Sequence, residues 1–253
     1  MSSIAKVLFL LINVIEMSLE KQNVIEENFR KLFTEESFRE HMSDEEFRRF
    51  NASTERMHFQ KGEILFGEQE APKHVFFINS GTAKLSKLGA YGKEQILRFI
   101  PEGDIAGYRS LLCGENFQAK AEAMTDVTAT RIPAEQFMSL LENDVRFTFA
   151  MLQKFAFELG ESSNTITFLA QKTVRERLAE VLVLLEQKLG TDPEGFINIS
   201  LTREEIANLI GTATESAIRL ISEFKQDKLI ETEGRNIRIL NHDKLRKVAH
   251  VQL

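Results

Sequence analysis

The hydrophobic pattern changes along the chain, and each change predicts a different kind of element. Between His58 and Pro133, short alternating or apolar runs are separated by glycines. Short strands at such intervals are typical of an antiparallel barrel or jelly roll. We therefore expect a β-roll with strands over residues 58–66, 75–79, 82–88, 95–100, 119–124 and 127–132.

Helical patterns lie on both sides of this β-roll. Apolar residues at helical spacing in residues 21–57 predict one or two helices that lead into the sheet. Residues 135–187 are nearly free of helix breakers, and within them apolar residues recur at alternating steps of three and four. This seam is typical of a helix that pairs with a copy of itself. The predicted dimer seam consists of Leu152, Phe155, Leu159, Ile166 and Leu169.

Two helix starts follow at a short interval in residues 201–224. Thr202 with Glu205, and Thr212 with Glu215, have the spacing of capping boxes. Each pair therefore predicts the first turn of a helix.

Gly211 lies between these two starts. A glycine there can adopt the positive φ that ends the first helix, over residues 203–210, and lets the second leave at a steep angle. The combination is that of a helix-turn-helix unit, which binds DNA. A palindromic DNA site needs two such units, so we favour the homodimer. The alternative is a long helix packed on its own β-roll, and its broad apolar content is compatible with both arrangements.

A hairpin is predicted after the two helices, with its turn at residues 233–236. It has the place of a wing and would bring Arg235 or Arg238 near DNA phosphates.

The patterns together predict an α+β protein in four parts. Residues 1–20 are an apolar extension or reflect an upstream start codon, since their apolar run is too short to span a bilayer and no signal-peptide cleavage site follows. Residues 21–143 form the β-roll sensor domain and residues 144–171 the dimerisation helix. Residues 172–253 form a winged helix-turn-helix domain.

Net charge changes the picture only when the chain is divided. The 253 residues carry 32 basic and 38 acidic side chains, a net charge of −6. Residues 172–253 hold 13 of each, so the whole excess of acid lies upstream. Non-specific attraction to phosphates should be modest, and specific geometry must supply much of the DNA affinity.

The motifs of two regions carry a family resemblance. Thr202-Arg203-x-Glu205-Ile206, followed by Gly211 and by Glu215-Ser216-x-x-Arg219, resembles the helix-turn-helix signature of the bacterial Crp/Fnr transcription regulators. Residues 59–65 and 75–81 are similar to the β-roll of cyclic-nucleotide-binding domains, and residues 173–179 resemble the family's hinge.

The second helix offers a DNA-reading face. Thr214, Glu215, Ile218 and Arg219 share one side of it, where a glutamate can accept from a cytosine amino group and an arginine can bind guanine through two hydrogen bonds. Glu215 could instead serve only its capping box. The resemblance also places a glutamate and an arginine at these positions, and the lack of an arginine at Thr214 favours a TTGA-like half-site. The predicted DNA contacts are Thr202, Arg203, Thr212, Thr214, Glu215, Ser216, Ile218, Arg219 and Arg235.

The resemblance also implies where an effector would bind. The family's cyclic-AMP pocket uses a glutamate and an Arg-Ser pair, but Tyr108 stands at the glutamate position. Arg109 and Ser110 resemble the pair but come too early in the segment. Ser162 and Ser163 fall where relatives contact their nucleotide across the dimer. We therefore expect a degenerate pocket with an unknown small-molecule effector, the alternative being a regulatory module that responds to cyclic AMP.

The remaining chemistry is sparse. The only cysteine, Cys113, excludes an internal disulfide and the four-cysteine cluster of the family's iron–sulfur branch. The histidines show no metal-ligand spacing, and no catalytic motif is present. We therefore expect no metal site, no cofactor and no enzymatic activity. The expected partners are double-stranded DNA, a second copy of the chain and RNA polymerase, in the bacterial cytoplasm and away from the membrane.

Overall fold

The computed structural model describes residues 27, 29, 31–32, 43–89 and 92–250. The predicted amino-terminal extension, residues 1–20, lies outside them. The chain divides into two compact units, one with Leu97–Gly160 and the described residues up to Leu88, the other with Gly89–Ile96 and the residues from Glu161 onward. Within the described part, no helix has the length and apolar character needed to cross a membrane.

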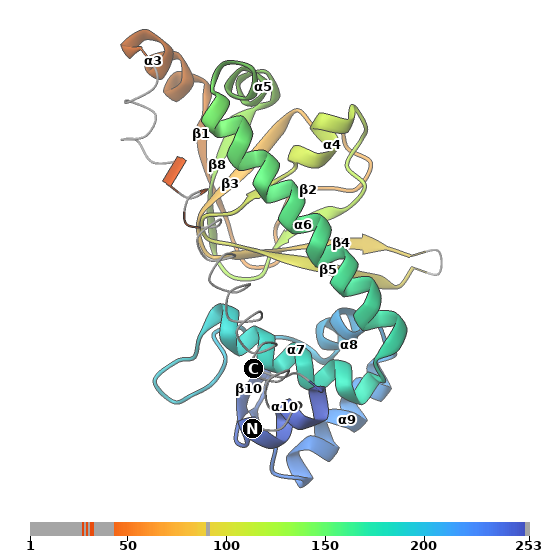
Figure 1. Ribbon diagram of the computed structural model, residues 1–253. Helices are drawn as coiled ribbons and strands as arrows, with labels where there is room; N and C mark the ends of the chain where they lie inside the picture. Colours follow the sequence, from red (N-terminus) through yellow and green to blue (C-terminus); the bar gives the residue numbers. More distant parts are fainter. Residues whose placement is uncertain (1–26, 28, 30, 33–42, 90–91, 251–253) are drawn as a thin grey trace, which may run out of the picture. The chain divides into compact units, whose positions relative to one another are not determined.

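The first unit is an antiparallel β-roll, as predicted (Figure 1). Its two four-stranded sheets have the orders β1-β8-β3-β6 and β2-β7-β4-β5. The strands are β1 (Glu55–Phe59), β2 (Ile64–Phe66), β3 (His74–Ser80), β4 (Thr82–Leu88), β5 (Glu94–Pro101), β6 (Ile105–Ala106), β7 (Lys120–Ala123) and β8 (Val127–Pro133).

The predicted single strand over residues 58–66 is wrong. A turn separates β1 from β2, in which the Glu63 amide donates to the Gln60 carbonyl at 2.9 Å. Gly62 has a φ of 90°, a conformation that a strand residue with a side chain rarely adopts. The short strand β6 and the helix α4 (Tyr108–Cys113) were not predicted as elements.

Strand β3 shows why the β-roll has two cores. Val75 and Phe77 point to one face, and Phe76 and Ile78 to the other, because successive side chains of a strand alternate. Phe76 and Ile78 join the cluster between the sheets. Val75 and Phe77 join a cluster with side chains from α3 (Asp44–Ser53), α5 (Ala134–Asn143) and α6 (Val145–Gln171).

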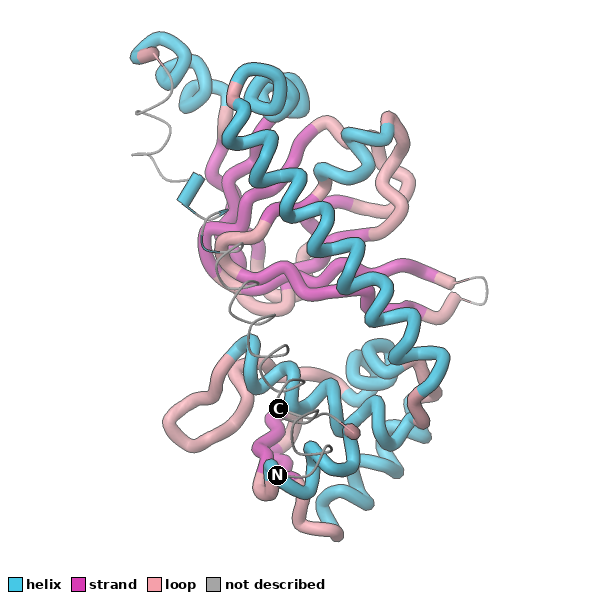
Figure 2. The backbone as a smooth tube through the Cα atoms, in the orientation of Figure 1, coloured by secondary structure: helices cyan, strands magenta, loops and turns pink. Residues whose placement is uncertain are grey.

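Helix α6 uses one face to cover this second core, and Figure 2 shows it as one continuous helix. Phe147 and Met151 are each 1% exposed in the cluster. Phe155, predicted as a seam residue, also packs against it, and its ring lies edge-on to Tyr108 with centroids 5.2 Å apart. The ring is thus half-buried against its own protomer, and its place in the dimer seam stays a prediction.

The second unit contains the predicted helix-turn-helix and hairpin. Its elements are α7 (Val174–Leu189), α8 (Arg203–Ile210), α9 (Thr214–Gln226), β9 (Ile230–Glu233), β10 (Asn236–Ile239) and α10 (His242–Ala249). Apolar faces of the helices meet in one core, where Leu178, Ile210 and Phe224 are fully buried. A capping box formed by Thr173 and Glu176 starts α7. The sequence motif for this box went unnoticed.

Candidate functional site

The first helix of the helix-turn-helix begins and ends as its sequence predicts. The Thr202 side chain accepts from the Glu205 amide, and the Glu205 carboxylate accepts from the Thr202 amide at 2.8 Å. This reciprocal capping box satisfies donors that the first turn of α8 would otherwise leave without partners. Gly211 ends the helix with φ 62° and ψ 50°, the left-handed conformation that glycine adopts readily.

The second predicted capping box is wrong. The N-cap of α9 is Ala213, and no side chain caps it. The physical reason is that the Thr212 amide donates to the Ala207 carbonyl at 3.0 Å, so Thr212 still belongs to the end of α8. Glu215 is exposed in the first turn of α9 and is free of the capping role.

Helix α9 presents a polar face beside its buried one. Ala217, Leu220, Ile221 and Phe224 are buried, whereas Glu215, Ile218 and Arg219 are exposed. The Arg219 side chain is 75% exposed, and an ion pair joins its Nε to Glu223 at 3.9 Å. A pair so long and so exposed restrains the guanidinium weakly. Thr214 and Ser216 are half-buried next to this face.

The basic residues of the hairpin differ in how firmly they are held. Arg238 lies over the Phe196 ring, donates to the Glu194 carbonyl at 2.6 Å and pairs with Glu231. These contacts hold the Arg238 side chain in place within the protein. Arg235 is exposed in the two-residue loop between β9 and β10. Of the two arginines considered in the sequence, Arg235 is thus the better placed to meet a phosphate.

The carboxyl-terminal end of α9 is anchored by a residue that sequence reasoning missed. Arg175 of α7 donates to Glu223 at 3.0 Å and to Asp227 at 2.8 Å. Its guanidinium also lies 4.8 Å from the centroid of the Phe224 ring. No local pattern joins residues so far apart in the chain, so only the fold reveals this contact.

The segment expected to hold an effector is split between inside and outside. Ser110 is buried, whereas Arg109 points outward and pairs with Glu115 at 2.7 Å. The two therefore do not form one anion-binding pair. Ser162 and Ser163 are exposed on α6. Tyr108 is 2% exposed and takes part in the polar contacts described next.

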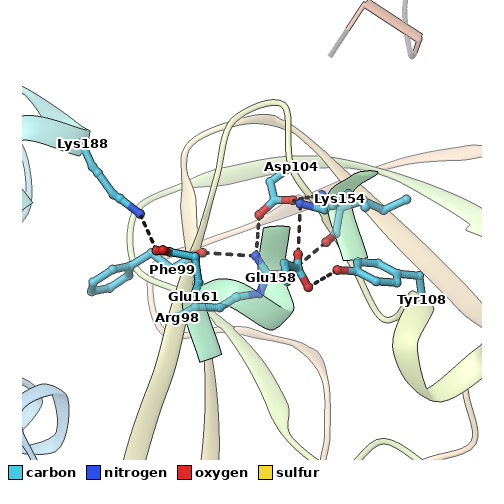
Figure 3. A network of polar contacts seen from close by, with 9 residues as sticks. Arg98, Phe99, Asp104, Tyr108, Lys154, Glu158, Glu161 and Lys188 are labelled. Atoms are coloured by element: carbon cyan, nitrogen blue, oxygen red, sulfur yellow. Dashed lines mark hydrogen bonds and ion pairs between the residues drawn. The ribbon is translucent and has the colours of Figure 1, made fainter. Parts of the chain in front are cut away.

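Tyr108 belongs to a network of five polar side chains, shown in Figure 3. Its hydroxyl donates to the Glu158 carboxylate. Arg98 pairs with Asp104 at 2.5 Å and with Glu158 at 3.4 Å, and Lys154 pairs with Asp104 at 2.5 Å and with Glu158 at 3.1 Å. Two cations thus face two carboxylates, and the network is electrically balanced by the protein alone.

Burial and ion pairing act in opposite directions on the pKa values in this network. Burial alone would raise the pKa of Asp104, but Arg98 and Lys154 outweigh it and hold that pKa below the ordinary value. Burial raises the pKa of Tyr108, with Glu158 adding to the effect, so the phenol stays protonated and can donate. Asp104 is therefore a charged acceptor and Tyr108 a neutral donor.

Sequence reasoning identified only Tyr108 of these five side chains. Lys154 and Glu158 are spaced i,i+4 on α6, which is a recognisable local signal for an ion pair. Arg98 and Asp104 lie on either side of the turn that ends β5. Nothing in the sequence alone connects that turn to α6.

Helix α6 also carries an apolar row on its outer face. Val145, Leu152, Leu159 and Ile166 are spaced seven residues apart and are 83, 61, 71 and 68% exposed. Phe149 adds a ring that is 58% exposed. The predicted seam residue Leu169 is half-buried. Such a row on one surface helix is the type of apolar patch that marks an interaction site.

Comparison with known proteins finds similarities for both the β-roll and the helix-turn-helix region. The chain matches family models for a cyclic nucleotide-binding domain over residues 56–144 and for a Crp-like helix-turn-helix domain over residues 176–248. The fumarate and nitrate reduction regulatory protein of Vibrio cholerae is 29% identical over 195 residues, which cover 76% of this chain and 77% of that protein. The transcriptional activator protein Anr of Pseudomonas aeruginosa is 29% identical over 197 residues, covering 77% and 80%.

Solved structures agree with the fold. FixK2 from Bradyrhizobium japonicum matches with a TM-score of 0.69 at 23% identity, covering 79% of this chain and 99% of that chain. A transcriptional regulator of the same structural type from Thermus thermophilus matches with a TM-score of 0.67 at 23% identity, covering 78% and 99%.

Proposed function

The chain belongs to the Crp/Fnr family of transcription regulators and has a helix-turn-helix DNA-binding domain; from this premise we propose that it acts as a homodimer that reads a palindromic DNA site through α9. The observation that carries the proposal is the exposed face of α9, where Glu215 and Arg219 are held by no strong contact with the residues that the structure describes. Base-reading side chains need this freedom, because they must exchange water for base edges.

The reading roles follow from the chemistry of the two side chains. Arg219 can donate two hydrogen bonds to O6 and N7 of guanine, and Glu215 can accept from the amino group of cytosine. The missing capping box supports this role for Glu215, since α9 does not use its carboxylate as a cap. Ile218 lies between them and can contact a thymine methyl group. A TTGA-like half-site contains the guanine and thymine that these contacts require.

The outer row of α6 supports the dimer. Val145, Leu152, Leu159 and Ile166 repeat every seven residues, the period at which two helices remain in contact along their length. Two copies joined in this way carry two copies of α9, which a palindromic site requires. RNA polymerase is the further partner that a transcription regulator in the bacterial cytoplasm would meet. The proposed role is regulatory and involves no catalysis by this chain.

The balanced network of the β-roll supports binding of DNA without cyclic AMP. A cyclic nucleotide brings a negative charge, and a site for it must offer an unpaired cation or donor. Arg98 and Lys154 are both paired with the protein's own carboxylates, and Arg109 is paired with Glu115. The competing function, regulation by cyclic AMP, would require these pairs to open.

Selection of bound duplexes from a random pool tests the proposal. The full chain is used twice, with and without cyclic AMP, and the enriched sequences are aligned. We expect an inverted repeat of TTGA-like half-sites in both selections. An asymmetric consensus or none would contradict the dimeric reader, and enrichment only with cyclic AMP would favour the competing function.

A further inference from the structure

Arg203 makes a contact that its position in the sequence does not predict. It is the first residue of α8, directly after the capping residue Thr202. Its Nη2 atom donates to the carbonyl oxygen of Gly234 at 3.1 Å. Gly234 is the first residue of the loop between β9 and β10. The amino-terminal end of α8 is thus tied to the tip of the hairpin.

The other terminal nitrogen of Arg203 is closed to solvent. Nη1 is buried and has no hydrogen-bond partner in the described part of the chain. An atom without accessible surface cannot contact a phosphate unless the side chain first moves. Moving it would also break the bond to Gly234, because both nitrogens belong to one rigid planar group. Arg203 was predicted to contact DNA directly, and its observed contacts favour an indirect role.

The hairpin needs such a tie at its tip. Each strand has four residues, and an isolated two-stranded hairpin of this length is marginally stable in water. Its middle is held well, since the Ile197 amide donates to the Ile237 carbonyl at 2.9 Å and Arg238 lies over Phe196. At the tip, Arg203 supplies a contact from outside the hairpin.

We propose that Arg203 is a positioning residue for DNA binding: by holding the Gly234 carbonyl, it fixes the hairpin tip so that the adjacent, exposed Arg235 meets a backbone phosphate. The inference rests on the proposed function, because it assumes that the hairpin approaches DNA. It assigns the phosphate contact to Arg235 and gives Arg203 no direct contact with the nucleic acid.

A double-mutant cycle on the salt dependence of binding tests the assignment. Affinity for the selected palindrome is measured over a series of salt concentrations for the wild type, Arg203→Met, Arg235→Met and the double variant. The plot of log K against log salt has a negative slope, and each lost phosphate contact makes it shallower by about 0.9 per half-site. We expect Arg235→Met to make the slope shallower by about this amount. The double variant should have the same slope as Arg235→Met alone. Lys244→Met, which removes an exposed charge from α10, serves as the control for net charge.

The opposite result is equally clear. If the double variant loses about another 0.9 per half-site beyond Arg235→Met, then Arg203 contacts a phosphate itself and the inference is wrong. If the wild type does not bind duplex DNA at all, the proposed function fails instead. Hydrogen exchange in the DNA-free protein provides a separate measurement. Arg203→Met should speed exchange of the Arg235 and Asn236 amides, and unchanged exchange would overturn the tie between α8 and the hairpin.

Discussion

The recognition face of α9 and the polar network of the β-roll use the same kinds of side chain in opposite ways. On α9, Glu215 and Arg219 are exposed, and Arg219 is paired weakly with Glu223 at 3.9 Å. In the β-roll, Arg98 and Asp104 pair directly and are partly buried, with side chains 27 and 12% exposed. The first arrangement leaves charges available to a ligand, and the second already satisfies them.

This contrast shows that a family's fold does not fix which of its charges are available to a ligand. The family model for a cyclic nucleotide-binding domain covers residues 56–144, and within it Arg98 and Arg109 are paired with the chain's own carboxylates. Function depends on which charges remain free, and that is a property of particular side chains.

The strongest expected effect tests the buried side of the comparison. Asp104→Asn removes the carboxylate that both Arg98 and Lys154 contact, leaving two partly buried cations undercompensated. Breaking a buried ion pair in this way costs about 3 kcal/mol of unfolding free energy. Urea unfolding followed by circular dichroism measures it. Glu102→Gln, a nearby change at an exposed position, should leave stability nearly unchanged, and equal stability of the two variants would argue against the network.

Acid should weaken the same network with a defined sign. The pKa of Asp104 in the folded chain lies below the ordinary aspartate value of about 3.9, so its contribution to stability is complete above that value. The contribution is lost as the pH falls through the lower, folded pKa. Unfolding free energies of the wild type and Asp104→Asn should therefore converge as the pH drops below about 4. A constant difference down to the lowest pH at which the protein folds would contradict this assignment.

The next effect tests the exposed side. Arg219→Ala should weaken binding to the selected palindrome by about 2 kcal/mol and relax the preference for guanine at one position of each half-site. Its effect on the stability of the free protein should be small, since the side chain is 75% exposed. Gel shifts on duplexes with each base at that position measure the preference. Lys225→Ala, at the other end of α9, is the matched control, and equal losses on all four duplexes would exclude base reading.

The smallest effect compares two threonines of the helix-turn-helix. Thr202→Ala should cost about 1 kcal/mol of unfolding free energy, because it removes the cap of α8. Thr212→Ala should change stability by less than about 0.5 kcal/mol, because the structure gives that side chain no capping role. Thermal unfolding of both variants measures the difference. The reverse order would restore the capping box that the sequence predicted at Thr212.

Local rules accounted for much of the fold. The positions of α8 and of the hairpin followed from Thr202, Gly211 and the alternating residues around Gly234, because caps and turns depend on neighbours in the chain. The prediction of a second capping box was wrong for an equally local reason. The amide of Thr212 closes α8, and this shifts the start of α9 by one residue.

Contacts between distant segments could not be predicted in this way. The ring of Phe155 has the spacing of a seam residue, and only the fold shows that it also packs against Tyr108 and the core of its own β-roll. The network of Arg98 and Asp104 with α6 depends on tertiary packing that no periodicity encodes. The exposed face of α9 could be predicted in part. Helical spacing predicted which residues share this face, and the structure determined which of their side chains are exposed.

The most direct test of the central claim compares a whole palindrome with a half-site. Fluorescence anisotropy is measured for the full chain, without cyclic AMP, on the selected palindrome and on a duplex in which one half-site is scrambled. A dimeric reader should bind the palindrome with two chains per duplex and lose affinity by about a hundredfold or more on the scrambled duplex. Binding of one chain per duplex with equal affinity for both sites, or binding only after cyclic AMP is added, would contradict the account.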